Sequence, residues 1–459
     1  VNLAACKIAA VLFGLDRWQT LLAVGVLNVV FAAHSGLWGV LVIDMIQFFT
    51  MMTAVVGAAY FAVNLPEVGG LSALLDTVSA MQGPGGLNYL SLLPDFSNNW
   101  DLAVAIFVMP LAVQWWSVWY PGAEPGGGSY MAQRMLASRT EKDALGGTLF
   151  FNLAHYVLRP WPWILVALAS LAVYPELGDL RKALPHVDPS LVGHDIAYPA
   201  MVRFLPAGWL GLMVGGLIAA NSSTILTHLN WGASYLVHDF YRRFLQKDRD
   251  EKHYVFAGRV STILLFVVSS AMVFALETSQ DAFNIILQVG AGTGLLYLVR
   301  WFWWRVTAWC EITAMVVSFA MSVLLLFGRR GGFVLGTHQE LLLTVIVTSA
   351  CWLAVAYLGP QNDMETLISF YRKVRPFGPG WEPVRRAANI PLAEAEEDRR
   401  AANVPNALLG WVAGSVLIWS GLFTVGNFLY GRNDYAFALL ALSVVSGLLV
   451  IRSVNRRWR

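Results

Sequence analysis

The chain has 459 residues, of which 57% are hydrophobic and 13% are charged, and its mean hydropathy is +0.57. These proportions exclude an ordinary soluble domain, in which about a quarter of the residues are charged. The formal net charge is +2, and no basic run alternates with aromatic residues, so nucleic acid is not an expected partner. Cys6, Cys310 and Cys351 lie in or beside apolar stretches, so neither a disulfide framework nor a metal-binding spacing is expected.

Twelve apolar stretches follow one another along the chain, and most reach the roughly 20 residues that a bilayer crossing needs. They cover residues 2–14, 18–33, 38–62, 101–119, 147–174, 206–237, 254–276, 281–300, 307–327, 338–358, 407–430 and 434–452. This pattern predicts an all-α polytopic membrane protein with about twelve transmembrane helices.

Basic residues are distributed unevenly between the loops that join these stretches. One set of alternate loops, together with the C-terminal tail, holds 21 Lys and Arg residues, whereas the other set holds seven. Because basic residues near the ends of spans collect on the cytoplasmic side, we expect the richer set and the tail to be cytoplasmic. The predicted location is the plasma (inner) membrane.

Three segments between the apolar stretches differ from simple loops. Residues 65–100 and 175–205 carry Gly, Pro, Asp and isolated aromatics, which suits short surface helices that act as lids over an entrance. Residues 359–406 combine a basic aromatic stretch with a charged patch, which predicts a cytoplasmic linker with one interfacial helix. The stretch 101–119 runs into a cluster of Pro and Gly, which either breaks a helix near a binding site or forms a plain turn out of the membrane.

A cluster of polar side chains lies inside the apolar stretch 206–237, where lipid offers no water to satisfy them. Its members are Asn221, Ser222, Ser223, Thr224 and Thr227. On a helix, Ala220, Ser223 and Thr224 are spaced i, i+3 and i+4, which brings one carbonyl and two hydroxyl oxygens to one face. This face predicts a cradle for a small hard cation. The alternative is that the hydroxyls bond back to the preceding turn of their own helix.

Three separate stretches resemble the sodium:solute symporter family, which includes bacterial proline, sialic acid and galactose symporters and the animal sodium/glucose transporters. They are HSGLWGVLVIDMIQFF (34–49), YMAQRMLASRTEKDALGGTL (130–149) and SSTILTHLNWGASYLVHDFY (222–241). The resemblance implies the fold first seen in a bacterial leucine transporter, with two inverted five-helix repeats and the substrate at mid-membrane between them.

The resemblance also divides the chain. The implied parts are the remainder of the first repeat with core helices three to five (1–64), an extracytoplasmic segment (65–100), the second repeat with core helices six to ten (101–300), peripheral helices (301–358), the cytoplasmic linker (359–406), and the C-terminal helices with a basic tail (407–459). The sequence opens at Val1 inside an apolar stretch, so we expect that the first two core helices are missing. A fragment without them is not expected to transport.

By the resemblance, the main sodium site falls on the Ala220 carbonyl and the Ser223 and Thr224 hydroxyls. Some members hold a second sodium, and Asp44 and Thr227 match that site. However, Leu226 stands where a further hydroxyl would be. Asp44 and Thr227 are therefore candidates for either a second ion or an exit path, and Asp44 alternatively has no special role.

Five further residues are candidates for substrate binding. His155 lies where galactose-type members place a substrate-binding Lys, which weakens a sugar assignment and introduces a group that titrates near neutral pH. Gln288 aligns with a Gln that contacts substrate in sugar transporters. Trp116 and Tyr120 lie near the family's aromatic inner gate, or belong to an interfacial aromatic belt. Glu124, inside a Pro and Gly insertion, is either a substrate or cation contact or a solvated loop carboxylate.

The predicted function is sodium-coupled secondary active transport that imports a small polar organic solute by alternating access, with Na⁺ as the coupling ion and no other cofactor. An enzyme is not expected, because no nucleophile, metal cluster or pair of carboxylates has a recognisable spacing. The alternatives are a membrane sensor built on the same fold, which would need a signalling domain, and a proton-coupled symporter.

Overall fold

The computed structural model describes residues 1–32, 37–83, 86–114, 135–274, 290, 292–332, 335–376, 378–394, 396 and 404–457. Within these residues the secondary structure is helical, and the β contacts amount to two isolated bridges, Gly83–Leu87 and Trp303–Gly380. This confirms the predicted all-α class.

Eight helical segments of the described residues are long and apolar enough to cross a membrane. They are Met45–Val63, Glu141–Val173, Ala207–Leu245, Glu251–Val273, Ala308–Gly328, His338–Leu358, Pro405–Leu429 and Asn433–Asn455. A ninth span results if Asn2–Phe13 and Arg17–Asn28, which are bent by 113° relative to each other, count as one. These segments confirm a polytopic membrane protein. The number twelve stays a prediction, because the stretches 101–119 and 281–300 extend outside the described residues.

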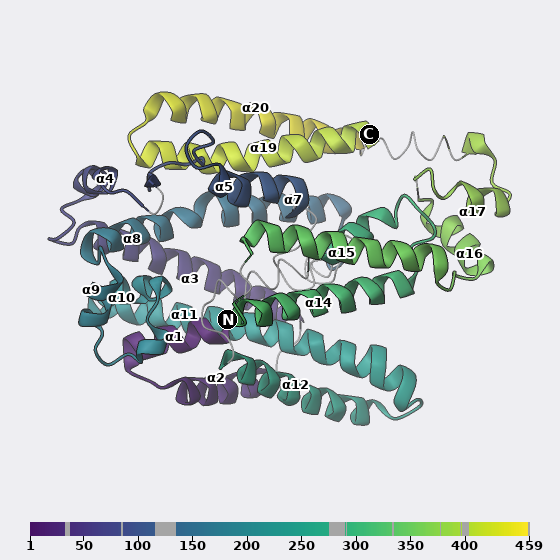
Figure 1. Cartoon of the computed structure of the whole chain (residues 1–459), viewed down its shortest axis with the longest axis horizontal. Helices are drawn as coiled ribbons and strands as arrows, with labels where there is room; N and C mark the ends of the chain where they lie inside the picture. Colours follow the sequence, from purple (N-terminus) through teal and green to yellow (C-terminus); the bar gives the residue numbers. More distant parts are fainter. Residues whose placement is uncertain are drawn as a thin grey trace. The chain divides into compact units, whose positions relative to one another are not determined.

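The described residues fall into two compact units, and the first comprises Val1–Leu90 and Arg159–Ala282. Its helices are α1 (Asn2–Phe13), α2 (Arg17–Ala32), α3 (Leu37–Val63), α4 (Leu71–Ala80), α8 (Pro160–Val173), α9 (Leu177–Ala183), α10 (Ala197–Val202), α11 (Ala207–Ser234), the π-helical continuation η7 (Tyr235–Leu245) and α12 (Glu251–Val273), which Figure 1 labels in part. Two short 3₁₀ turns, η5 (Pro189–Leu191) and η6 (His194–Ile196), precede α10.

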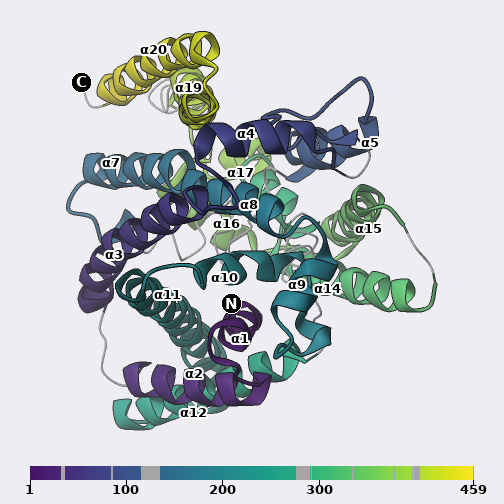
Figure 2. The ribbon, with the colours of Figure 1, turned by 90° about the vertical axis from the view of Figure 1, so that its left-hand side faces the viewer.

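Helix α11 is the central element of this unit. It packs against α3, α12 and α2, and α3 in turn packs against α8. Figure 2 shows α2 running beside α12. Helix α1 ends at Phe13 and is capped by Gly14, whose φ of 65° is the left-handed conformation that glycine adopts without a steric penalty. Gly14 starts the bend into α2.

The segment predicted as an outer lid, 175–205, packs on α1 in this unit. Leu180, Leu184 and Ile196 are buried together with Ala10 and Val11 of α1. Lys7 of α1 is buried, and its ammonium group donates to both carboxylate oxygens of Asp195 at 2.9 and 2.8 Å. The segment is therefore held against α1 by an apolar core and by an ion pair.

The second unit comprises Ser91–Leu158 and Phe283–Arg459. Its helices are α5 (Trp100–Ala103), the π-helical segments η2 (Val104–Val108) and η3 (Pro110–Gln114), α7 (Glu141–Asn152), the π-helical η4 (Leu153–Leu158), α14 (Ala308–Arg330), α15 (Thr337–Leu358), α16 (Met364–Val374), α17 (Glu382–Ala387), α19 (Val404–Leu429) and α20 (Asn433–Arg457). Helices α19 and α20 lie side by side in both views (Figures 1 and 2), and the Ser420 and Ser443 hydroxyls meet at 2.8 Å between them.

The segment predicted as a linker, 359–406, contains α16 and α17 with a small core of their own. Leu367, Tyr371, Trp381 and Val384 are buried in it. The Trp381 indole donates to the Arg300 carbonyl at 3.1 Å, which ties this core to the turn that follows residue 299.

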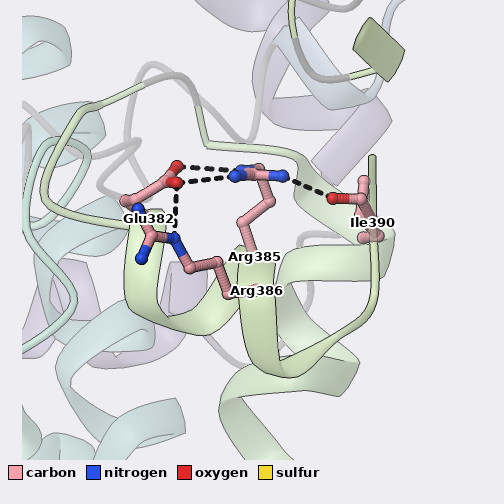
Figure 3. A network of polar contacts seen from close by, with 4 residues as sticks. All are labelled: Glu382, Arg385, Arg386 and Ile390. Atoms are coloured by element: carbon pink, nitrogen blue, oxygen red, sulfur yellow. Dashed lines mark hydrogen bonds and ion pairs between the residues drawn. The ribbon is translucent and has the colours of Figure 1, made fainter. Parts of the chain in front are cut away.

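Charged side chains of α17 form a hydrogen-bonded network with one another. The Arg385 guanidinium donates to both oxygens of Glu382, at 2.6 and 2.8 Å, and also to the Ile390 carbonyl (Figure 3). Arg386 adds a further bond to Glu382 at 2.9 Å. These bonds to the charged carboxylate, first those of Arg385 and then that of Arg386, lower the pKa of Glu382 to about 2.

Candidate functional site

The predicted cation-binding oxygens lie near the middle of α11. Ala220 lies thirteen positions after Ala207, the first residue of α11, which is about 20 Å at 1.5 Å per residue. Helix α11 approaches α3 closely through glycines: a Cβ added at Gly57 would lie 2.3 Å from the Trp209 ring, and one added at Gly216 would lie 2.8 Å from the Met51 sulfur. Small residues at these points allow the helix backbones to come close, which fixes the position of α11 against α3.

The hydroxyl groups of this turn bond back along α11. Thr224 Oγ1 donates to the Ala220 carbonyl at 2.9 Å, and Thr227 Oγ1 donates to the Ser223 carbonyl at 2.9 Å. His228 Nδ1 lies 2.7 Å from the Thr224 carbonyl. This is the local arrangement that the sequence offered as the alternative to an ion site.

Back-bonding does not remove the capacity of the hydroxyl oxygens to hold a cation, because a hydroxyl that donates its proton keeps both lone pairs. The Ala220 carbonyl already accepts the Thr224 hydroxyl and, in the regular helix, the Thr224 backbone N–H, so it would give up one of these bonds to bind a cation. The bond also holds Thr224 Oγ1 next to the Ala220 oxygen, so two of the three predicted ligands already lie together. The donor set is neutral and purely oxygen, as a hard cation prefers, and it fits Na⁺. Three oxygens from one helical turn cannot surround an ion, so further ligands have to come from another element.

Ser222 behaves differently from its neighbours. Its side chain is buried, and its hydroxyl has no hydrogen-bond partner among the described residues. Two positions along a helix correspond to about 200° of rotation, so Ser222 does not share the face of Ala220 and Thr224. The sequence marked it only as part of the polar cluster.

His155 lies in η4, in the second unit. Its ring stacks on Phe151 with centroids 5.1 Å apart and an interplanar angle of 13°, and it meets Tyr156 edge-on at 4.7 Å. The side chain is half-buried. The imidazole is therefore part of an aromatic cluster, which suits either a packing role or the wall of a pocket that binds a solute.

The remaining candidate residues lie wholly or partly outside the described part of the structure. Asp44 lies within α3, but its side chain is outside the described part of the structure. Trp116, Tyr120, Glu124 and Gln288 lie outside the described residues. Their proposed roles stay predictions. Within the described residues, no group of three or more His, Cys, Asp or Glu is placed to hold a metal ion.

Two charged residues inside apolar stretches were not selected from the sequence. Lys7 pairs with Asp195, and Arg259 lines a groove between η7 and α12. The signal was available, because a charged side chain within a membrane span needs a partner or a function. The sequence shows the charge but not the partner.

Comparison with known proteins places the chain in a family. The sodium:solute symporter family description matches residues 3–318, which is more than half of the chain. The chain belongs to the sodium:solute symporter family. This confirms the resemblance seen in the sequence. The match ends within α14, so α15 to α20 lie outside it.

Curated relatives of this symporter-family chain are transporters rather than enzymes. A sodium/glucose cotransporter from Vibrio parahaemolyticus is 25% identical over 330 residues, which cover 69% of this chain and 58% of the relative. The high-affinity proline transporter PutP of Bacillus subtilis (strain 168) is 27% identical over 169 residues, 35% of this chain and 33% of the relative. The human sodium/myo-inositol cotransporter 2 is 24% identical over 287 residues, 58% of this chain and 40% of the relative. The chain thus spans less than two thirds of each of these relatives.

Proposed function

We propose that the protein is a sodium-coupled secondary transporter that imports a small polar organic solute by alternating access. The observation that carries this proposal is the turn from Ala220 to Thr224, which holds neutral oxygens together at the middle of a helix within the family match. The names of two of the three relatives include sodium, and all three name transport of a small polar solute.

The proposed main ion site is formed by the Ala220 carbonyl and the hydroxyls of Ser223 and Thr224. Sodium binding would recruit the lone pairs of Thr224 Oγ1 that its bond to Ala220 leaves unused. If sodium binds the outward-open conformation more tightly, it raises the population of that conformation and of the solute site formed in it. Coupling is then a difference in ion affinity between conformations and requires no chemical reaction.

Thr227 and Asp44 are proposed as an exit path for the ion. Thr227 lies three residues beyond Thr224, about 4.5 Å further along the axis of α11. A second hydroxyl one turn on, with a carboxylate in α3, would offer a leaving ion successive oxygen contacts. We favour this role over a second resting site, because Leu226 supplies no hydroxyl.

We propose that His155 lines the solute pathway together with Gln288, Trp116, Tyr120 and Glu124. The support for this role is the stacking of His155 on Phe151, because paired rings form flat walls suited to a small polar ring or chain. The solute class is left open between sugars, polyols, amino acids and carboxylates. The proposed location is the plasma (inner) membrane, with the C-terminal tail in the cytoplasm.

The ion site is tested by thermal unfolding of the purified protein in sodium and in potassium. The double variant Ser223→Ala with Thr224→Ala should lose the stabilisation that is specific to sodium. The matched control is Ser415→Ala in α19, which removes a hydroxyl with the same kind of back-bond, to the Trp411 carbonyl at 3.0 Å. It should keep the sodium response, and a sodium response that survives in the double variant would reject the site.

Proton coupling is the second candidate, because His155 is a half-buried titratable group in a candidate span. The two functions separate in reconstituted vesicles. A proton-coupled protein would accumulate solute under an imposed pH gradient without sodium, whereas a sodium-coupled protein would not.

A further inference from the structure

A groove lies between two antiparallel elements of the first unit, where α11 continues into η7 and α12 returns. Its volume is about 440 Å³. Three lining residues from α11 and η7, Asn230, Ser234 and His238, are spaced by four and so follow one face. On α12 the wall includes Gly258, where an added Cβ would meet no atom within 4 Å. The missing side chain therefore leaves the groove open.

The positive charge in this groove has no ion-pair partner among the described residues. Arg259 lines the groove and is exposed, and no carboxylate of the described residues pairs with it. The one carboxylate in the lining, Glu251, is already bound to Arg242 at 3.1 Å. The Asn230 and Ser234 side chains are exposed and also have no hydrogen-bond partner among the described residues.

Arg259 lies within a candidate membrane span, where an unpaired charge is costly. It lies eight residues after Glu251, about 12 Å along α12, within the candidate span Glu251–Val273. A guanidinium at this position can extend along the helix toward the membrane surface, but it still needs an anion to offset its charge. The groove provides the room for one.

The walls of the groove favour a lipid over a soluble anion. Val255 and Ile263 line it and are 55% and 48% exposed, so apolar surface lies directly beside the polar groups. The segment that precedes α12 carries four basic residues, Arg242, Arg243, Lys247 and Arg249, against two acidic ones, Asp248 and Asp250, so it would attract an anionic membrane surface. A ligand with a phosphate and acyl chains would contact both the polar groups and the apolar surface of the groove.

We infer that this groove binds the phosphate group of an anionic phospholipid. The Arg259 guanidinium presents paired donors that match phosphate oxygens, and Asn230 and Ser234 add neutral donors. The acyl chains would lie along Val255 and Ile263. This site goes beyond the proposed transport function and does not depend on it.

The inference is tested by titrating the purified full chain with phosphatidylglycerol or phosphatidylcholine and following its melting temperature. Phosphatidylglycerol should raise it and phosphatidylcholine should not. Arg259→Gln should weaken phosphatidylglycerol binding by about tenfold or more, as expected for the loss of a charged hydrogen-bonding group. The matched control Lys252→Gln removes an exposed charge seven residues away that does not line the groove, and should bind as the wild type does.

Two further arms keep the test decisive. Gly258→Leu fills the groove while leaving Arg259 in place, so it should also weaken binding even if Arg259→Gln folds poorly. Glycerol 3-phosphate carries the same phosphate without acyl chains and should compete only weakly. Unchanged binding in Gly258→Leu, equal binding in Arg259→Gln and Lys252→Gln, or equal competition by glycerol 3-phosphate would each overturn the inference.

Discussion

The packing of α3 on α11 can be tested by adding a single methyl group. In Gly57→Ala the new Cβ would lie 2.3 Å from the Trp209 ring, whereas ordinary contact begins at 3.4 Å, so the ring has to move by about 1 Å. That ring already packs edge-on against Phe61, with centroids 5.8 Å apart, which limits its retreat. Overpacking of this kind costs about 1–3 kcal/mol. Replacing Gly by Ala inside a helix recovers about 1 kcal/mol.

A matched control separates the two effects. Gly215→Ala in α11 adds the same methyl group where no atom lies within 4 Å, so only the gain in helix propensity remains. The two variants should therefore differ by about 1–3 kcal/mol in the free energy of unfolding, with Gly57→Ala the less stable. Melting temperatures in one detergent compare them directly. Equal stability, or a more stable Gly57→Ala, would refute the close approach of α3 and α11.

Two other predictions follow from the ion pairs. Asp195→Asn leaves buried Lys7 without its counter-charge and should lower the free energy of unfolding by about 1.5–3 kcal/mol. Lys7→Met leaves Asp195 partly in water and should lower it less. The reverse order of melting temperatures would contradict the role of this ion pair. Because the pKa of Glu382 is lowered to about 2, its contribution to stability is complete above its usual pKa of 4.5 and is lost as the pH falls toward 2. Amide hydrogen exchange in α17 should rise over that range, and a rise of the same size in Glu382→Gln would show that another group is responsible.

The class of the protein was readable from the sequence because hydrophobic length is a direct physical requirement of a bilayer. The stretch predicted at 206–237 corresponds to α11, which spans Ala207–Ser234 and continues as η7. The family also followed from local stretches, since their motifs lie within continuous segments of chain. The bond from Thr224 to Ala220 was foreseen as an alternative, because a helix always offers that carbonyl to a hydroxyl four residues later.

Contacts between distant segments were not readable in the same way. Lys7 showed that a charge lies in an apolar stretch, but its partner Asp195 is 188 residues away. The bond from Trp381 to the Arg300 carbonyl likewise joins residues 81 apart. By contrast, the spacing of Glu382 and Arg385 favours a local pair. Such pairs depend on how helices pack, and a single sequence carries no direct record of that packing.

The central claim is that sodium held by the turn from Ala220 to Thr224 drives solute uptake. The most direct measurement is solute accumulation in vesicles that contain the complete transporter, with sodium or choline outside, for the wild type and for Ser223→Ala with Thr224→Ala. The account predicts accumulation only in the wild type with sodium. Equal accumulation in choline, or undiminished sodium-driven accumulation in the double variant, would contradict it.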